Sequence, residues 1–474
     1  MKFVNRIKEL NDFEKLYGLS KKKCFSTVLY GQRRIGKTKL VREFMKDKPK
    51  KLFFFVDDSK NSQLLLEEYV EILKNQNLLG NFEKINTWNE FVEFLFVKCE
   101  DYLIVFDEFQ NFLSVDRSVF SIFQKNFDIY ENNKLLFIFL GSIIGLIKEV
   151  FENQKAPLYG RIKNSYHLKA LNFKNSCVML KNLGFKKFEE YVEFYSVFGG
   201  YPKYYVLLED YDIKELNTLS IIEKFIFSEN GILEKEIYNT LKLNFGNGKT
   251  NYYGIMDAIS LGNNNLSNIA NYVGLQVNSI SFFINELVNF YDFIDREVPN
   301  SELDAKKSKK GIYKLKNNMM NFYFRYVHKN SSLIQSGNIK MVMEKIKIDF
   351  NKFVSFSFED IVREFVLQRK EFSSYSRVGR EWGKFKGLKG SNSFEIDVCA
   401  VNEKERKILF GEVKWKDNID GESLLKDLRE KGKKVLWNFE SREEEYVLFA
   451  KSFKNKPKGI KCFDLKDLEK HFLK

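Results

Sequence analysis

One short stretch, placed between an apolar run and an amphipathic run, constrains the fold of this chain most. Residues 31–38 are Gly-Gln-Arg-Arg-Ile-Gly-Lys-Thr, which is the Gly-x-x-x-x-Gly-Lys-Thr spacing of a phosphate-binding loop. Residues 26–30 before it predict a buried strand, and residues 39–44 after it predict the first turns of a helix. This arrangement presents backbone N–H groups and a positive helix end to an anion. The sequence therefore predicts a site for the phosphates of ATP or GTP.

Two side chains of the loop have specific roles in such a site. Lys37 would place a positive charge beside the β- and γ-phosphates, and the Thr38 hydroxyl would coordinate Mg²⁺. Arg33 and Arg34 could contact either the phosphates or a neighbouring domain. The nucleotide-binding residues that we expect in this stretch are Gly31, Gln32, Arg33, Arg34, Ile35, Gly36, Lys37, Thr38 and Lys39.

Two carboxylates at the end of a later apolar run supply a second signal. The run 102–106 is followed by Asp107 and Glu108, about 70 residues after Lys37. Asp107 would hold the Mg²⁺ shell, indirectly or through water, and Glu108 would orient and deprotonate the attacking water. The pair could also be a plain strand end. Its position after the loop in a βα pattern favours the catalytic interpretation.

Two further residues could act on the transferred phosphoryl group. The run 135–140 ends in Gly141 and Ser142, and this end should lie beside the phosphate loop, where Ser142 could sense the γ-phosphate or be a plain turn serine. We favour sensing. Arg161 could stabilise charge that develops during transfer, or it could be an exposed loop arginine. Spacing alone does not separate these two interpretations.

Short apolar runs alternate with amphipathic stretches through the first 210 residues. Nearly continuous apolar runs are typical of strands buried on both faces, as in a parallel sheet covered by helices. The strands predicted in this way are residues 27–30, 52–56, 102–106, 135–140 and 165–168. The sequence therefore predicts an α/β fold with a parallel sheet for this part of the chain.

The pattern changes near residue 251 to short helices followed by a hairpin. Residues 265–274 and 276–290 predict a helix-turn-helix, and the charged segment 301–310 would be a wing tip or a flexible loop. The second helix begins with residues 276–281, which include no Arg or Lys, so sequence reading of DNA by this helix is not favoured. The expected wing strands are residues 293–298 and 311–315.

The first half contains six motifs that occur together: residues 3–10, 31–38, 107–108, 141–142, 157–161 and 198–202. In combination they resemble the archaeal-type P-loop ATPases, of the signal-transducing branch related to AAA+ proteins. The resemblance implies that Arg6 lies near the adenine or ribose, that the turn at Pro202 approaches the nucleotide from a lid, and that the nucleotide is ATP. No Asn-Lys-x-Asp guanine signature follows the loop. The turn could also simply join two helices.

Members of that group are often followed by a winged helix and by a domain that resembles the PD-(D/E)xK nuclease fold. The matching residues here are Glu359, Asp397, Glu412 and Lys414. Glu412 and Lys414 are two apart on a predicted strand and therefore share one face. Asp397 and Glu412 would bind a divalent cation, Lys414 would stabilise or activate a water that attacks a phosphodiester, and Glu359 would add a carboxylate from a helix.

The expected elements around these residues follow an α-β-β-α-β order. They are a helix near residue 358, strands 393–401 and 407–415, a helix 423–433, a strand 446–449 and a closing strand near residue 462. The chain as a whole is then predicted as an α/β P-loop ATPase core with a helical lid, a winged helix and a C-terminal α/β restriction-endonuclease-like domain. The predicted domain ranges are residues 1–210, 211–330 and 331–474.

Two interpretations of the C-terminal residues remain beside cleavage. Asp397, Glu412 and Lys414 could form an exposed cross-strand salt-bridge ladder, or the domain could retain the fold and act as a docking module. The leading hypothesis is an ATPase whose nucleotide state controls a nuclease-like domain that acts on DNA. The alternative is a regulatory switch that binds DNA or protein without cleaving it. A motor that moves along nucleic acid is a third hypothesis that no feature requires.

Composition limits the class of protein and its partners. A formal charge of +14 is compatible with binding to DNA through the C-terminal half, and also with a generally Lys-rich surface. The longest uncharged apolar run, residues 135–147, is shorter than the ~20 residues that cross a bilayer, so no membrane partner is expected. Five scattered cysteines without a Cys-x-x-Cys pair fit a cytoplasmic protein without a zinc site. A homo-oligomer is possible.

Overall fold

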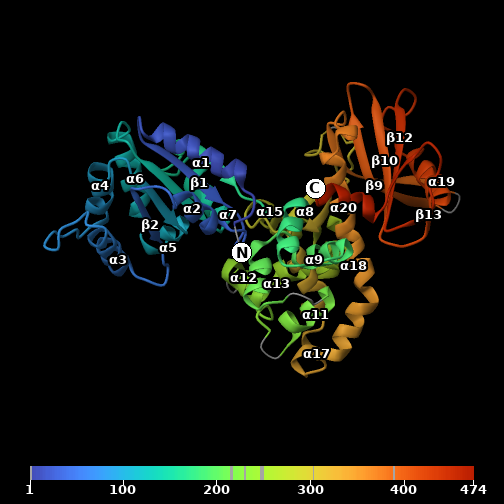
Figure 1. Cartoon of the computed structure of the whole chain (residues 1–474), viewed down its shortest axis with the longest axis horizontal. Helices are drawn as coiled ribbons and strands as arrows, with labels where there is room; N and C mark the ends of the chain where they lie inside the picture. Colours follow the sequence, from blue (N-terminus) through green and yellow to red (C-terminus); the bar gives the residue numbers. More distant parts are fainter. Residues whose placement is uncertain (1–2, 214–216, 229–230, 246–249, 303, 388–389) are drawn as a thin grey trace.

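The computed structural model describes residues 3–213, 217–228, 231–245, 250–302, 304–387 and 390–474. Figure 1 shows three parts in chain order: an N-terminal sheet covered by helices, a central group of helices, and a C-terminal sheet. The long helix α18 (Ile339–Gln368) runs from the central helices to the C-terminal sheet.

The N-terminal part is a five-stranded parallel sheet, as predicted. Its strand order is β2-β3-β4-β1-β5, so the strand before the phosphate loop lies between the fourth and fifth strands. Each predicted strand is present with its bounds shifted by one or two residues, because the apolar run marks the buried part of a strand better than its ends. The bounds are β1 (Phe25–Tyr30), β2 (Lys51–Phe55), β3 (Leu103–Asp107), β4 (Leu136–Gly141) and β5 (Asn164–His167).

The two faces of this sheet are covered by different helices. Phe137 and Phe139 alternate along β4, so both point to one face, where they pack with Phe106 and with α6 residues such as Phe123. Burial of each such ring stabilises the fold by about 2 kcal/mol. The opposite face packs against α1 and α2. The helices of this part are α1 (Ile7–Ser20), α2 (Lys37–Met45), α3 (Ser62–Asn75), α4 (Trp88–Lys98), α5 (Phe112–Val115), α6 (Ser118–Ile129) and α7 (Ile144–Phe151).

The central part contains short helices and one hairpin. The predicted helix pair is α14, capped by the Asn265 side chain and ended by Gly274 at φ 74°, and α15. The predicted hairpin is β6 (Ile294–Glu297) paired with β7 (Ile312–Leu315). The helices are α8 (Phe173–Asn182), α9 (Phe188–Phe198), α10 (Pro202–Asp210), α11 (Thr218–Ile222), α12 (Glu236–Phe245), α13 (Thr250–Ser260), α14 (Leu266–Val273), α15 (Val277–Asn289), α16 (Asn318–Phe322) and α17 (Ser331–Gln335).

The loop that joins β6 to β7 makes contacts that the sequence did not predict. Residues 301–310 were predicted as a wing tip or a flexible loop, yet the start of this loop is bound to the C-terminal sheet. The backbone N–H of Asn300 donates to the carbonyl of Arg380 at 2.8 Å, and the Ser301 hydroxyl donates to the Glu381 carboxylate at 2.8 Å. The partner strand was not visible in the sequence pattern, so the contact could not be predicted.

The C-terminal part is a mixed sheet in the order β14-β12-β10-β9-β8, between α18 and α19. The predicted helix near residue 358 is part of the 30-residue α18. The sequence analysis missed β8 and α20. Strand β8 is charged and rich in glycine, and an edge strand needs no continuous apolar run. The strands and remaining helices are β8 (Arg377–Gly387), β9 (Gly390–Asn402), β10 (Lys407–Lys414), β11 (Ile419–Asp420), α19 (Gly421–Gly432), β12 (Glu443–Ala450), β13 (Phe453–Asn455), β14 (Lys461–Phe463) and α20 (Leu465–Phe472).

A single buried apolar cluster connects the three parts. It includes Phe44 under the N-terminal sheet, Phe225 and Met320 of the central helices, and Phe358 and Val413 at the C-terminal sheet. Packing of this kind ties the parts to one another, since separation would expose the cluster to water. Among the described residues, we find no helix with both the length and the apolar character that a membrane span requires.

Candidate functional site

The phosphate loop lies between β1 and α2, and two glycines let it wrap closely. Gly36 has φ 92°, a backbone conformation that side chains disfavour, and it precedes the first residue of α2. A Cβ at Gly31 would lie 2.3 Å from the carbonyl oxygen of Leu168, so only glycine fits there. These two positions give the loop the shape in which successive N–H groups face one concavity.

Lys37 is held inside this loop. Its side chain is 6% exposed, and its ammonium donates to the carbonyls of Gly31 at 2.8 Å and Gln32 at 3.1 Å. Burial lowers the pKa of Lys37 to about 8, and the charges of Glu108 and Asp107 oppose this shift. Phosphate oxygens would compete with the two carbonyls for the same ammonium protons.

Thr38 is in α2, which follows β1, and it meets Asp107 at the end of β3 although β4 lies between β1 and β3. The Thr38 hydroxyl donates to Asp107 Oδ2 at 2.6 Å, and the carboxylate is buried. Burial is the main cause that raises the pKa of Asp107. A hydroxyl and a carboxylate beside a phosphate loop are the hard oxygen ligands that suit Mg²⁺. The residues present therefore fit this ion.

Glu108 is held by three donors. Its Oε2 atom accepts hydrogen bonds from the Ser142 hydroxyl at 2.6 Å, from the Ser142 backbone N–H at 3.2 Å and from the Gln110 amide at 2.6 Å. Ser142 follows β4, next to β1, as the sequence analysis predicted. Gln110, 1% exposed, was not identified from the sequence, although it lies only two residues after Glu108. The carboxylate must leave these donors before it can orient a water.

The turn at Tyr201 and Pro202 lies against the loop. A Cβ at Gly36 would be 3.8 Å from Pro202 Cγ, and the Tyr201 hydroxyl donates to the Gln32 amide oxygen at 2.6 Å. The other end of the Gln32 amide donates to the carbonyl of Asp292 at 2.6 Å. Gln32 is thus clamped between the lid and the segment that leads into β6.

The two arginines of the loop point to different partners. Arg33 lies 3.5 Å from the Ser142 hydroxyl, on the side of the acidic residues. Arg34 forms an ion pair with Glu236 at the start of α12, where Lys203 also lies 3.3 Å from the same carboxylate. Arg34 therefore contacts the central part, which is one of the two roles that the sequence left open.

Arg6 and Arg161 lie at opposite ends of the sheet. The Arg6 guanidinium donates to the carbonyl of Lys169 at 2.6 Å, just beyond β5 and on the side of the phosphate loop. Arg161 instead precedes β5, where its carbonyl accepts from the Ser26 hydroxyl and its side chain pairs with Asp128 at 2.8 Å. The length of β1, roughly 13 Å between Ser26 and Tyr30, separates it from the loop. Of the two interpretations left open for Arg161, one chain therefore supports the loop arginine and not a role at the transferred phosphate; spacing did not reveal which end of β5 it occupies.

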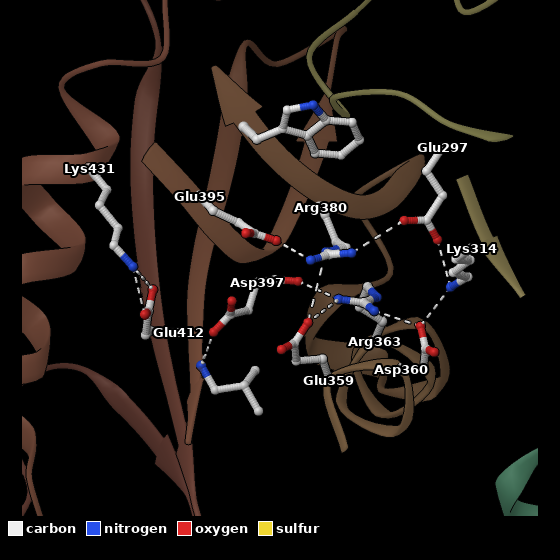
Figure 2. Close-up of polar contacts among 12 residues, drawn as sticks. Glu297, Lys314, Glu359, Asp360, Arg363, Arg380, Glu395, Asp397, Glu412 and Lys431 are labelled. Carbon is white, nitrogen blue, oxygen red and sulfur yellow. Dashed lines mark hydrogen bonds and ion pairs between the residues drawn. The ribbon is translucent and has the colours of Figure 1, made fainter. Parts of the chain in front are cut away.

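Figure 2 shows three of the four residues predicted in the C-terminal part, Glu359, Asp397 and Glu412, and the fourth, Lys414, pairs with Glu412. Val398 pairs with Gly411, so Asp397 and Glu412 are neighbours across β9 and β10, and both are buried, at 9% and 4% exposure. Asp397 Oδ2 accepts from the backbone N–H of Val413 at 2.8 Å. Glu412 pairs with Lys414 at 2.7 Å and with Lys431 of α19 at 2.6 Å.

Lys431 had no signal in the sequence, because it reaches Glu412 from a helix 19 residues further along. Burial, followed by the charge of Glu412, raises the pKa of Asp397 to about 6. Burial, followed by the charge of Asp397, also raises the pKa of Glu359. These shifts indicate a compact group of carboxylates that favours a cation.

Glu359 is not a third metal ligand beside Asp397 and Glu412. Its carboxylate lies 3.8 Å from both Arg363 and Arg380. In the chain as described, no three acidic, histidine or cysteine side chains gather closely enough to hold one metal ion. The expectation that Glu359 adds to the metal site is therefore wrong, because two arginines that the motif did not include attract it. Asp397 and Glu412 remain as a pair of oxygen ligands that fits a hard divalent cation.

Two known families match this chain, one over the phosphate loop and one over the C-terminal carboxylates. Residues 3–208 match a family described as an ATPase domain predominantly from Archaea, and residues 323–431 match one described as archaeal and bacterial proteins of unknown function. The solved Walker-type ATPase of Pyrococcus abyssi is 19% identical, covers 68% of this chain and 96% of its own, and has a TM-score of 0.49. The ORC2 protein of Aeropyrum pernix is 12% identical, covers 71% and 97%, and has a TM-score of 0.45.

A relative that matches this chain over nearly its whole length defines the family. An uncharacterised protein of Methanocaldococcus jannaschii is 32% identical over 454 residues, which are 93% of this chain and 94% of the relative. The chain belongs to the family of this protein, as an ATPase whose N-terminal domain is of the predominantly archaeal type and is followed by a domain of unknown function.

Proposed function

We propose that Lys37, Thr38, Asp107 and Glu108 carry out ATP hydrolysis at the phosphate loop. Lys37 neutralises charge on the β- and γ-phosphates, and Thr38 and Asp107 hold Mg²⁺, which withdraws charge from the phosphates when it is bound. The observation that carries this proposal is the direct contact between Thr38 and Asp107 next to the buried ammonium of Lys37.

Glu108 is the base in this proposal. After release from Ser142, its carboxylate takes a proton from a water whose oxygen bonds to the γ-phosphorus, while the bond from that phosphorus to the bridging oxygen breaks. The products are ADP and inorganic phosphate. Ser142 therefore restrains the base until the γ-phosphate displaces it.

Steady-state ATP hydrolysis by purified full-length variants tests these roles. Lys37→Ala should lose nucleotide binding, and Glu108→Gln should bind ATP but hydrolyse it at least about 100-fold more slowly. Arg161→Ala is the control, because it also removes one positive charge but at a position away from the loop, beside Asp128. Wild-type turnover in Lys37→Ala or Glu108→Gln would overturn the assignment, and loss of turnover in Arg161→Ala would move Arg161 to the site of a second chain.

We further propose that the C-terminal pair Asp397 and Glu412 holds a divalent cation and cleaves phosphodiester bonds of DNA, under the control of the nucleotide state. The support is the burial of both carboxylates side by side and the cation Lys414 on the same face. The proposal includes domain boundaries at residues 210 and 330. It also includes a winged helix formed by α14, α15 and the β6–β7 hairpin.

Cleavage of supercoiled and linear DNA with Mg²⁺ or Mn²⁺ tests it. Asp397→Asn and Lys414→Met should lose cleavage. Lys416→Met should retain it, because Lys416 is an exposed lysine two residues further along the chain. Cleavage that survives in Asp397→Asn would come from another site or a contaminant and would overturn the proposal.

A regulatory switch without cleavage is the second candidate, and one observation favours it. Glu412 is already bound by two lysines and Asp397 by a backbone N–H, so each carboxylate is satisfied by the protein itself. In that case the domain would bind DNA in a salt-dependent manner and leave it intact. The same cleavage assay, combined with a binding assay at several salt concentrations, separates the two candidates.

A further inference from the structure

The short hairpin β6–β7 contacts both sites described above. At its open end, Asp292 and Lys316 pair at 2.5 Å, and the carbonyl of Asp292 accepts from Gln32 of the phosphate loop at 2.6 Å. His167, at the end of β5, lies 3.3 Å from the same Asp292 carboxylate. The hairpin is therefore attached directly to the edge of the sheet where nucleotide binds.

The hairpin also reaches the charged neighbours of the C-terminal carboxylates, through Lys314 and through Glu297 at its loop end (Figure 2). Lys314 pairs with Glu297 across the hairpin at 2.6 Å and with Asp360 of α18 at 3.0 Å. Glu297 lies 3.6 Å from Arg380 of β8. Asp360 in turn binds Arg363 at 2.6 Å. Arg380 therefore has a charged partner on the hairpin itself, Glu297. The partner of Arg363, Asp360, is bound by Lys314 of the hairpin.

These two arginines are the immediate neighbours of the carboxylate site. Arg363 donates to the backbone carbonyl of Asp397 at 2.6 Å, and Arg380 lies 3.8 Å from Glu359. Both side chains are largely buried, and a buried charge that loses its partner is costly, so the arginines move if Glu297 or Lys314 moves. The position of the hairpin consequently affects Asp397.

The hairpin is short and stiff enough to transmit a displacement. Four paired residues on each strand, from Ile294 with Leu315 to Glu297 with Ile312, separate its ends by roughly 10 Å. Its loop is fixed to the C-terminal sheet, where the Asn300 amide donates to the carbonyl of Cys399 at 2.8 Å. A shift at Asp292 therefore cannot be absorbed in the loop alone.

Gln32 is the residue whose contacts nucleotide binding would change. Its carbonyl accepts from Lys37 at 3.1 Å, while its side chain holds Tyr201 and Asp292. Phosphate oxygens compete for the protons of Lys37, so the backbone of Gln32 loses a bond when nucleotide binds. A ligand can shift a structure only through contacts that differ between the free and bound states, and the bond from Lys37 to the Gln32 carbonyl is such a contact.

We propose that Glu297 and Lys314 are positioning residues of the carboxylate site, and that the β6–β7 hairpin conveys the nucleotide state from Gln32 to Arg363 and Arg380. The inference rests on the proposed function, because it states how one site regulates the other. It requires no assumption about the nucleic acid that the carboxylate site acts on.

Hydrogen exchange, measured by mass spectrometry on the full chain with ADP or a non-hydrolysable ATP analogue, tests the coupling without any cleavage. The amides of Asn300 and Ser301, bonded to β8, should change exchange rate by about threefold or more when nucleotide binds. Gln32→Ala removes the side chain that holds Asp292 and Tyr201, and at nucleotide concentrations that saturate this variant, as calorimetry measures, the change should vanish. Lys148→Met is the control, because Lys148 contacts Asn289 in the same interface but not the hairpin. An unchanged response in Gln32→Ala, or no response in the wild type with bound nucleotide, would overturn the coupling.

Mn²⁺ binding to the full chain without nucleotide, followed by electron paramagnetic resonance, tests the positioning role. Lys314→Met should weaken the Asp397-dependent Mn²⁺ site by about threefold or more, while Lys314→Arg should restore it. Lys310→Met removes an exposed lysine of the loop before β7 that pairs with Glu302, and this variant should bind Mn²⁺ as the wild type does. Wild-type binding by Lys314→Met would overturn the role. If the wild type shows no Asp397-dependent binding, the proposed metal site and the positioning role both fail, and the exchange experiment still decides the coupling.

Discussion

The buried ammonium of Lys37 should make ATP binding depend on pH near pH 8. Burial is the largest cause that lowers its pKa to about 8. Bound phosphates favour the charged form, so the pKa of Lys37 is higher with nucleotide than without it. A group whose pKa rises on binding gives its full contribution below the free-state pKa and loses it as the pH rises through that value. Affinity should therefore fall above pH 8.

The size of the effect follows from the free-state pKa. Lys37 is about 90% protonated at pH 7 and about 10% protonated at pH 9, so the Kd for ATP should rise by about tenfold between them, or about 1.4 kcal/mol. At pH 8, binding should take up about half a proton per ATP. Lys37→Arg is the matched control, because a guanidinium stays charged over this range, and its Kd should change by less than about twofold.

Titration calorimetry of the full chain with ATP at pH 7, 8 and 9 measures both quantities. Two buffers with different ionisation enthalpies at pH 8 give the number of protons taken up. A wild-type Kd that stays constant over this range, or the same pH dependence in Lys37→Arg, would refute the reasoning that the ammonium is desolvated within the loop.

Three further predictions concern the base, the lid turn and the interface with the C-terminal part. In Ser142→Ala, loss of the 2.6 Å hydroxyl bond removes one of the three donors to Glu108, so its carboxylate should leave them more readily and the basal rate of ATP hydrolysis should rise by about fivefold or more; a lower rate would assign Ser142 to the γ-phosphate instead. In Gly200→Ala, the new methyl would lie 1.7 Å from the Leu171 carbonyl oxygen, so urea denaturation should show a free energy of unfolding that is about 2–3 kcal/mol lower than in the wild type. In the control Gly18→Ala, in an open part of α1, the free energy of unfolding should rise by about 0.5–1 kcal/mol. Burial, followed by the charge of Glu189, raises the pKa of Glu193 to about 7, so ionisation of the folded protein costs free energy as the pH rises from 4.5 to 7. Glu193→Gln should therefore be about 1–2 kcal/mol more stable than the wild type at pH 8 and no more stable at pH 5; equal stability at pH 8 would contradict this.

Local sequence was sufficient to predict the phosphate loop and the strands around it. The loop needs glycines at fixed spacing, and a strand buried on both faces needs an apolar run, so both leave a pattern in adjacent residues. The same reasoning failed for β8, since an edge strand such as Arg377–Gly387 can be polar. It also left the role of Arg161 open, because a motif does not specify the end of a strand at which it lies.

Residues that reach a site from distant segments left no such pattern. Lys431 approaches Glu412 from a helix, and Arg380 approaches Glu359 from the strand that the sequence analysis missed. The contact between Gln32 and Asp292 joins residues 260 positions apart. Tertiary packing alone brings such pairs together, so the link between the two sites emerged only from the structure.

The rate of DNA cleavage in two nucleotide states tests most directly the claim that nucleotide controls the C-terminal site. Glu108→Gln with ATP supplies the triphosphate state, and the wild type with ADP supplies the diphosphate state, both with Mg²⁺ or Mn²⁺. The account predicts rates that differ by about fivefold or more, and no difference when Gln32→Ala is added to each. Equal rates in the two states, or intact DNA while the wild type hydrolyses ATP, would contradict it.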